Sequence, residues 1–175
     1  ITLRRIEWSV AAAIALLAVG VAFGTLWQKN MRQQQQIDQL LAETENTRKM
    51  LILSMLQEQS ASQRIKAMNT AVAERATHPQ VIEALIQTLL ADDNVNVRMK
   101  AAEALGQFGQ QKEVVTALTR ALRTEESPEV QITLIDVLTN LKAKEAMDEF
   151  KTLMKKDDLL DVVKNKAAYG VEILM

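Results

Sequence analysis

The C-terminal half of the chain repeats one apolar pattern every 33 residues. The repeating positions are Val97, Ala101, Leu105 and Phe108, then Val130, Leu134, Leu138 and Leu141, then Val163, Ala167 and Val171. A period of this length is typical of stacked helix pairs, because one pair cannot bury its apolar faces alone. Each unit holds two apolar helical stretches, such as 81–90 and 97–108. The pattern predicts an extended stack whose surface suits binding of a partner, not a closed globule.

The composition favours an all-α protein and argues against several classes of site. Only 3% of the 175 residues are aromatic and there are five glycines and two prolines, which is typical of a chain that is helical throughout. The formal net charge of −1 and the lack of a clustered basic face argue against a nucleic-acid partner. Because there is no cysteine, disulfides and thiolate metal sites are excluded.

A run of uncharged residues near the N-terminus predicts a membrane anchor. Residues 8–27 read WSVAAAIALLAVGVAFGTLW and contain no charge. As a helix, such a run spans roughly 30 Å, about the thickness of the hydrocarbon core of a bilayer. Trp8 and Trp27 stand where indole rings favour the membrane interface. A cleaved signal peptide fits less well, because its apolar region is usually about 7–15 residues long.

The residues beside this run leave its orientation open. Arg4 and Arg5 precede it and Lys29 and Arg32 follow it, so a rule that counts basic residues on each flank gives a tie. The positive-inside rule alone therefore does not place either end.

Within the run, Gly20 and Gly24 form a GxxxG pattern. Two small residues on one face let a second helix approach closely, which predicts a homodimer in the bilayer. The alternative is that small residues are simply common in membrane helices. Both interpretations stay open.

The polar segment 28–46 is expected to continue as a helical stalk, because no glycine or proline interrupts the chain between Thr25 and His78. A broken heptad runs along it at Ile37, Leu40, Leu41, Thr44 and Thr47. Threonine and glutamine occupy positions that a stable two-stranded seam would fill with leucine or isoleucine, so a coiled coil is only weakly specified.

Turn residues divide the repeats into helices. Pro79 and Pro128 suit the first helical position, where a missing N–H costs nothing. Asn94, with the two aspartates before it, and Ser127 offer side-chain oxygens as N-caps. Gly109 is expected to close a helix in the left-handed conformation.

Residues 93–106, DNVNVRMKAAEALG, resemble the second helix of a HEAT repeat, in which an aspartate, a valine and an arginine lead into a helix rich in alanine and leucine. In the following units Gln131 and Lys164 stand where Arg98 stands. The resemblance implies a HEAT-like α-solenoid, with weaker polar bonding between repeats at those two positions.

The whole arrangement is similar to the membrane-anchored HEAT-repeat proteins of bacteria that carry a small zinc-binding anti-sigma domain before the anchor. That resemblance implies a cytoplasmic domain that holds a sigma factor of the extracytoplasmic-function class, and a periplasmic repeat domain that senses a signal. With one histidine and no cysteine, this chain cannot hold the family's zinc. It is expected to be the anchor and repeat domain of a longer regulator, or a relative that has lost the regulatory domain.

The expected fold is therefore all-α, with one transmembrane helix leading into a stalk and about four HEAT-like helix pairs. The divisions are a cytoplasmic flank at 1–7, the transmembrane helix at 8–27, the stalk at 28–46 and the repeat domain at 47–175. The expected location is the inner membrane, with the N-terminus in the cytoplasm and the lipid bilayer around the anchor.

Chemistry-bearing clusters are sparse, so no cofactor, metal or catalytic residue is predicted. His78 is the one histidine and has no partner at a suggestive spacing. The acidic pairs at 125–126 and 157–158 lack the alternating oxygen ligands of a calcium loop. The chain has no glycine-rich phosphate loop and no nucleophile motif.

In HEAT-like stacks the second helices line the concave face, which nominates six residues for contact with another protein. They are Arg98, Lys100, Glu103, Gln107, Gln131 and Asp136. The alternative for each is an ordinary solvated face. Mixed charge predicts modest, salt-sensitive binding.

The favoured function is the protein-binding sensory part of a membrane-anchored anti-sigma regulator. The alternative is a membrane-tethered adaptor that gathers envelope proteins and has no role in transcription. A third hypothesis, an enzyme built on HEAT-like repeats such as a tetrapyrrole lyase, would require more repeats and reactive side chains in the groove.

Overall fold

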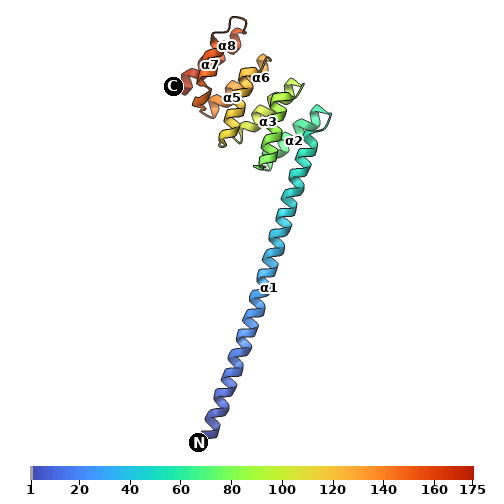
Figure 1. Ribbon diagram of the computed structural model, residues 1–175, viewed down its shortest axis with the longest axis vertical. Coiled ribbons are helices and arrows are strands. Elements are labelled where there is room, and N and C mark those ends of the chain that lie inside the picture. The colour runs from blue at the N-terminus through green and yellow to red at the C-terminus, as the bar shows by residue number, and fades with distance from the viewer. Residues whose placement is uncertain (1) are drawn as a thin grey trace. The chain divides into compact units, whose positions relative to one another are not determined.

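The computed structural model describes the backbone of residues 2–175 and the side chains of residues 27–29 and 31–175. Across that part of the chain it is helical without strands, which confirms the all-α class. It divides into two compact units, Ile1–Thr47 and Arg48–Met175. The helices (Figure 1) are α1 Thr2–Leu56, α2 Ala61–Ala73, α3 Pro79–Ala91, α4 Val95–Gly106, α5 Lys112–Thr124, α6 Pro128–Asn140, the short 3₁₀ helix η1 Lys144–Ala146, α7 Met147–Met154 and α8 Asp161–Leu174.

Helix α1 includes both the predicted anchor and the predicted stalk. Apart from Trp27, the side chains of the predicted transmembrane segment 8–27, with Gly20 and Gly24, lie outside the described residues. Among the residues that are described, no helix is both long enough and apolar enough to cross a membrane.

The second unit is a stack of four helix pairs, as the repeat predicts. The end of α1 and α2 form the first pair, because Ile52 and Leu56 share the core with Met68 of α2. The other pairs are α3 with α4, α5 with α6, and α7 with α8. The repeating apolar positions form its core: Val97, Ala101, Leu105, Val130, Leu134, Leu138, Val163 and Ala167 are buried. Each pair therefore buries its apolar faces against its neighbours, as a solenoid requires.

The second helices of the pairs, α2, α4, α6 and α8, pack more closely on one another than the first helices do. Small residues make this approach possible. A Cβ atom on Gly106 of α4 would lie 2.9 Å from Cγ1 of Val137 of α6, and one on Gly170 of α8 would lie 2.9 Å from Oγ1 of Thr139 of α6. Because the second helices are the closer layer, they lie on the inner side of the curve of the stack.

Local sequence signals account for the starts of α3, α4 and α6. Pro79 and Pro128 begin α3 and α6, as predicted. The side-chain oxygen of Asn94 caps α4 by accepting hydrogen bonds from the backbone N–H groups of Asn96 (2.9 Å) and Val97 (3.2 Å). Ser127 stands at the N-cap of α6, but its hydroxyl donates to the Glu129 carboxylate at 2.7 Å and makes no capping bond.

The expectation for Gly109 is wrong. Helix α4 ends at Gly106, and the φ of Gly109 is not positive. Gly109 is required for close packing, because the side chain of Leu141 occupies the space that a Cβ atom would fill. The left-handed positions are instead Arg75 (φ 48°) and Lys142 (φ 54°), where glycine is the commoner choice.

We expect Gly170→Ala to lower the free energy of unfolding by about 1–3 kcal/mol, because overpacking outweighs the gain of about 0.5–1 kcal/mol in helix propensity. The added methyl would meet the buried Phe150 ring and the hydroxyl of Thr139. Urea unfolding of the full chain measures this, with the exposed Glu172→Ala in the same helix as control. Equal or greater stability of Gly170→Ala would show that α8 does not approach α7 and α6 this closely.

Candidate functional site on the second helices

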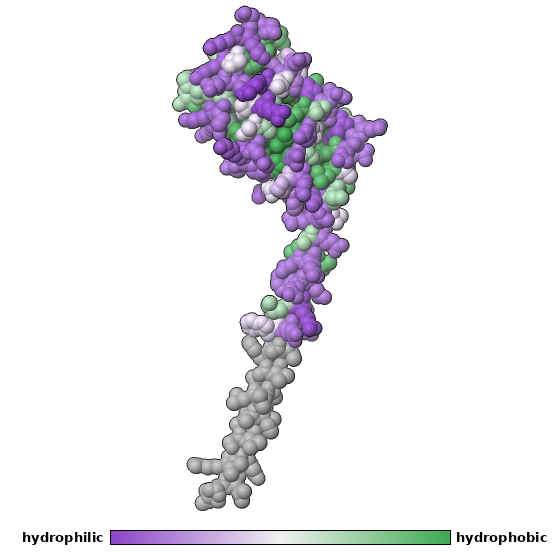
Figure 2. Space-filling view, in the orientation of Figure 1, coloured by the Kyte–Doolittle hydropathy of each residue, from purple (hydrophilic) through white to green (hydrophobic). Residues whose placement is uncertain are grey.

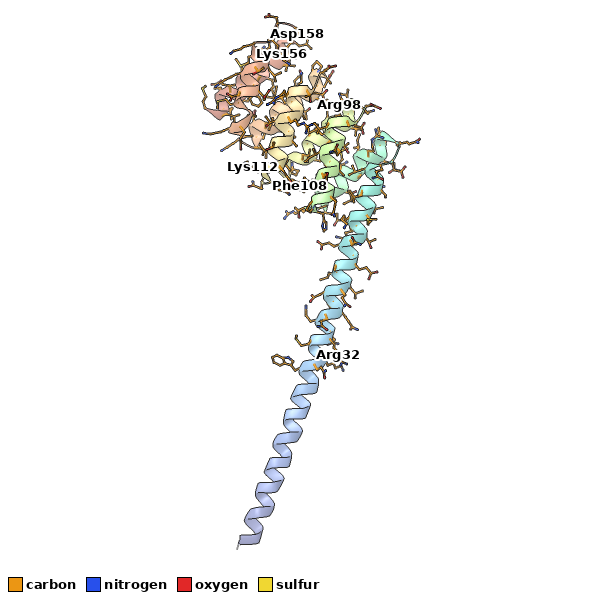
Figure 3. The ribbon with its side chains drawn as sticks, in the orientation of Figure 1. Arg32, Arg98, Phe108, Lys112, Lys156 and Asp158 are labelled. Carbon is orange, nitrogen blue, oxygen red and sulfur yellow. The ribbon has the colours of Figure 1, made fainter. Side chains whose placement is uncertain are left out.

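Arg98, in the first turn of α4, joins the second helix pair to the third. Its Nε and one terminal nitrogen donate to the two carboxylate oxygens of Glu125, each at 2.9 Å. Its other terminal nitrogen donates to the backbone oxygen of Asp92 at 2.8 Å. Such a two-pronged contact fixes geometry better than a single ion pair. Figure 3 shows Arg98 and Phe108 toward opposite ends of α4, as expected from their places near its start and just beyond its end.

Arg64 makes the equivalent connection between the first and second pairs. It forms an ion pair with Asp92 at 2.7 Å and donates to the backbone oxygens of Glu58 and Gln59, each at 2.8 Å. Asp92 also accepts a hydrogen bond from the backbone N–H of Asn94 at 2.9 Å, so its carboxylate stabilises the turn between α3 and α4 as well as binding Arg64. Two successive junctions are thus closed by the same arginine and acid arrangement.

The third and fourth pairs are not joined by an ion pair from the position of Arg64 and Arg98. They are linked instead by Arg123 of α5 with Glu149 of α7, and by Lys166 of α8 with Asp136 of α6. Gln131 is buried, and its amide nitrogen donates to the backbone oxygen of Glu125 at 2.7 Å. Lys164 reaches only the backbone oxygen of Asp157, at 3.5 Å. Both side chains therefore bond to the turn of their own pair, whereas Arg64 and Arg98 also bind an acid of the next pair.

The environment of Glu125 favours its charged form. Burial alone would raise the pKa of this carboxyl group, but hydrogen bonds from Arg98 and from the backbone N–H groups of Ser127 and Glu126 lower the pKa below its ordinary value. The pKa of Arg98 is raised, chiefly by its hydrogen bond to Glu125. The pair is thus ionised under ordinary conditions.

A shallow hollow of about 360 Å³ lies between α4 and α6 at this same junction. Three of the six predicted binding residues, Glu103, Gln107 and Asp136, line it together. The remaining lining residues are Gly106, Thr133, Val137, Asn140 and Leu141. We call this hollow the α4–α6 groove.

The carboxylates of the groove are paired with lysines at its edges. Lys100 Nζ lies 3.0 Å from Glu103 Oε2, and Lys166 Nζ lies 2.6 Å from Asp136 Oδ1. All four side chains are between one-third and about half exposed. Exposed pairs of this kind contribute only about 0–1 kcal/mol, so a partner could replace either lysine at little cost.

Two amide side chains and an apolar end complete this face. Gln107 and Asn140 are exposed and stand 33 residues apart on α4 and α6. In α8, Ile173 is the equivalent of Gln107 and Asn140, and Tyr169 is the equivalent of Glu103 and Asp136. These two side chains are 48% and 54% exposed. The face of the second helices therefore changes from polar at the groove to apolar at the last pair.

The structure separates the six predicted residues into two groups. Glu103, Gln107 and Asp136 line the groove and Lys100 borders it, whereas Arg98 and Gln131 are used in contacts of the turns. The sequence analysis missed Thr133, Asn140, Tyr169 and Ile173. The 33-residue period could have identified two of them, because Asn140 and Ile173 follow Gln107 by one and two periods.

Other sites have less to recommend them. A more apolar hollow of about 420 Å³ lies between the first helices α3 and α5, where Ile86 and Leu90 face Lys112 and Arg120. His78 is the N-cap residue of α3 and its side chain makes no capping bond. Within the described residues no three histidine, aspartate or glutamate side chains could together hold a metal ion.

We expect the stability contributed by Glu125 to depend on pH. Because its pKa is lowered on folding, the contribution is complete above about pH 4.5 and is lost as the pH falls through the depressed value. In Glu125→Gln, the free energy of unfolding should therefore fall less steeply below pH 4.5 than in the unmodified chain. Urea unfolding across the acid range measures this, with the exposed Glu126→Gln as control. Identical pH profiles for Glu125→Gln and the unmodified chain would contradict the assignment.

Comparison with known proteins agrees with this architecture. No curated protein matches the chain. Residues 49–127 match the family model of HEAT repeats, a segment that runs from the end of α1 to the turn before α6. HEAT repeats generally mediate binding between proteins, and an all-α solenoid of this kind is typically a non-enzymatic scaffold. A HEAT-repeat region is therefore present in this chain, which suggests a protein-interaction scaffold.

Proposed function

We propose that the chain is a membrane-tethered scaffold that binds another protein along the second-helix face of its repeats. The observation that supports the proposal most directly is the α4–α6 groove. It is lined by two exposed amide side chains, by two carboxylates paired with lysines, and by the apolar side chains of Val137 and Leu141. The matched HEAT repeats support the same class of function.

The groove suits a partner segment in an extended conformation. Packed helices lie about 8–10 Å apart, which corresponds to roughly three residues of extended chain at about 3.3 Å each. Gln107 and Asn140, on neighbouring helices, each offer an N–H donor and an oxygen acceptor to such a backbone. Tyr169 and Ile173 would add apolar contact at one end of the segment, because exposed aromatic and aliphatic groups are frequent anchors of interfaces.

The electrostatic part of this binding would be modest. A partner that displaces Lys100 from Glu103, or Lys166 from Asp136, exchanges one exposed ion pair for another. Such an exchange of ion pairs affects the orientation of the partner and the salt dependence of its association rate more than it affects the affinity of the complex.

In its finer form, the proposal places this scaffold in an anti-sigma regulator. Residues 8–27 would anchor the chain in the inner membrane, the repeats would lie in the periplasm, and a cytoplasmic domain preceding Ile1 would hold the sigma factor. Support comes from the uncharged run of twenty residues and from the resemblance of the whole arrangement to such regulators. The alternative is a tethered adaptor of envelope proteins with no role in transcription.

We expect a photo-reactive amino acid at Gln107 to form a covalent adduct with a second protein in native membranes. The same substitution at Gln87, an exposed glutamine of the first helix α3, is the matched control and should form none. Reversing both groove carboxylates, Glu103→Lys with Asp136→Lys, should reduce the adduct several-fold, because each new lysine would lie beside Lys100 or Lys166, whereas Glu83→Lys on α3 should not. Adducts from Gln87 but not from Gln107 would place the interface on the first helices and contradict the proposal.

The same variants separate the regulator from the adaptor. If the chain senses a signal for a sigma factor, the double reversal should change transcription of that factor's target genes under envelope stress. Loss of the adduct with unchanged transcription would leave the adaptor as the function.

A further inference from the structure

Helix α1 carries an apolar stripe that no residue of its own unit covers. Ile37 is 50% exposed, and Leu40 and Leu41 are each 63% exposed. Thr44 and Thr47 continue the stripe at the same helical spacing. We call residues 37, 40, 41, 44 and 47 the stalk stripe. The hydropathy colouring in Figure 2 shows apolar patches among polar ones along this part of α1.

The helix around this stripe has no local source of tertiary stability. Every side chain from Met31 to Thr47 is exposed, and the unit that ends at Thr47 contains only this helix. Isolated helices in water are marginal, because most helical stability in proteins comes from packing of an apolar face. A binding partner along the stripe would supply that packing.

The register of the stripe matches a two-stranded coiled coil. Taking Ile37 as position a of a heptad places Thr44 at the next a, and Leu40 and Thr47 at the d positions. β-branched residues at a with leucine at d favour two parallel strands. Leu41 falls at position e and widens the apolar face.

The threonine hydroxyls do not oppose burial of this stripe. Thr44 Oγ1 donates to the backbone oxygen of Leu40 at 2.8 Å, and Thr47 Oγ1 donates to that of Glu43 at 2.9 Å. Each hydroxyl is thus satisfied within its own helix and leaves a methyl group for the seam. Burying an unsatisfied hydroxyl would instead be costly.

Charge along the helix selects a second copy of this chain as the partner. The a and d positions of the stripe carry no charge, so two identical copies in register bring no like charges together at the seam. Beside the seam, Glu43 at g and Arg48 at the following e carry opposite charges, and a parallel pair in register places the g position of one copy beside the following e position of the other. Asp38 and Glu45 fall at b, and Arg32, labelled in Figure 3, falls at c, all away from the seam. Gln34, at position e, donates to Asp38 at 3.2 Å.

We infer that residues 37–47 of two copies pair as a short, parallel, in-register coiled coil. The seam is shorter than the three to four heptads of a strongly specified coiled coil, so its association is weak in dilute solution. Holding both chains in one membrane or micelle raises their effective concentration and favours the dimer. This inference does not depend on which protein binds the α4–α6 groove.

The chain contains no cysteine, so single cysteines can report the pairing without background. The test uses the full chain purified in mild detergent, with Ile37→Cys, Leu40→Cys or Thr44→Cys at the seam. Gln39→Cys and Ala42→Cys, at positions c and f, are the controls. After mild oxidation, the seam variants should form covalent dimers several-fold more than the controls, because only a parallel pair in register places identical seam residues together.

A second variant tests whether apolar contact drives the pairing. Leu40→Asp in the Thr44→Cys background should strongly reduce the disulfide-linked dimer, whereas Gln39→Asp should not. An unchanged melting curve of the repeat domain would show that folding is intact. Equal yields at seam and control positions would reflect random collision and overturn the inference. Absence of a dimer at every position would also overturn it. If the same seam cysteines instead formed an adduct of another mass in native membranes, another protein would cover the stripe and the inference would be wrong.

Discussion

The close packing of the second helices is the interaction on which the rest of this structure depends. Alanines and glycines at the contacts, such as Ala101, Gly106 and Gly170, let α4, α6 and α8 approach one another with no space for larger side chains. The first helices are less closely packed. The difference between the two layers curves the stack and turns the second helices toward its inner face. It also brings Glu103 and Gln107 of α4 opposite Asp136 and Asn140 of α6, which forms the groove.

The arginine contacts determine how firmly each junction is held. Breaking a largely buried pair by removing one partner costs far more than losing an exposed pair, because a charge is left without its counterion. The side chains of Arg98 and Glu125 are 16% and 9% exposed, whereas those of the lysine and acid pairs at the groove are between 33% and 51% exposed. The junction that carries the groove is therefore held at the turns by a strong contact, while the groove itself is lined by weak pairs that can exchange. A fixed frame with exchangeable surface charges suits a binding site.

Much of this architecture could be predicted from the sequence, because the features that determine it are periodic and local. The 33-residue repeat identified the buried face of the second helices α4, α6 and α8, and Pro79 and Pro128 marked two helix starts. Contacts between repeats were harder to predict. Gly109 was expected to adopt a left-handed turn, but its role is set by Leu141, which lies 32 residues away in the sequence. Gln131 was placed on a binding face because it lies on a second helix, yet it is buried against the turn before α6. In both cases a neighbouring pair, which local patterns do not describe, determines the environment.

The central claim is that a partner occupies the α4–α6 groove, and protection of a single cysteine tests it most directly. Gln107→Cys and Gln87→Cys would each be labelled with a membrane-permeable maleimide, in native membranes and in the purified chain. The account predicts that labelling at position 107 is much slower in membranes than in the purified chain, whereas labelling at position 87 is the same in both. Equal labelling at position 107 in both preparations, or protection confined to position 87, would contradict it.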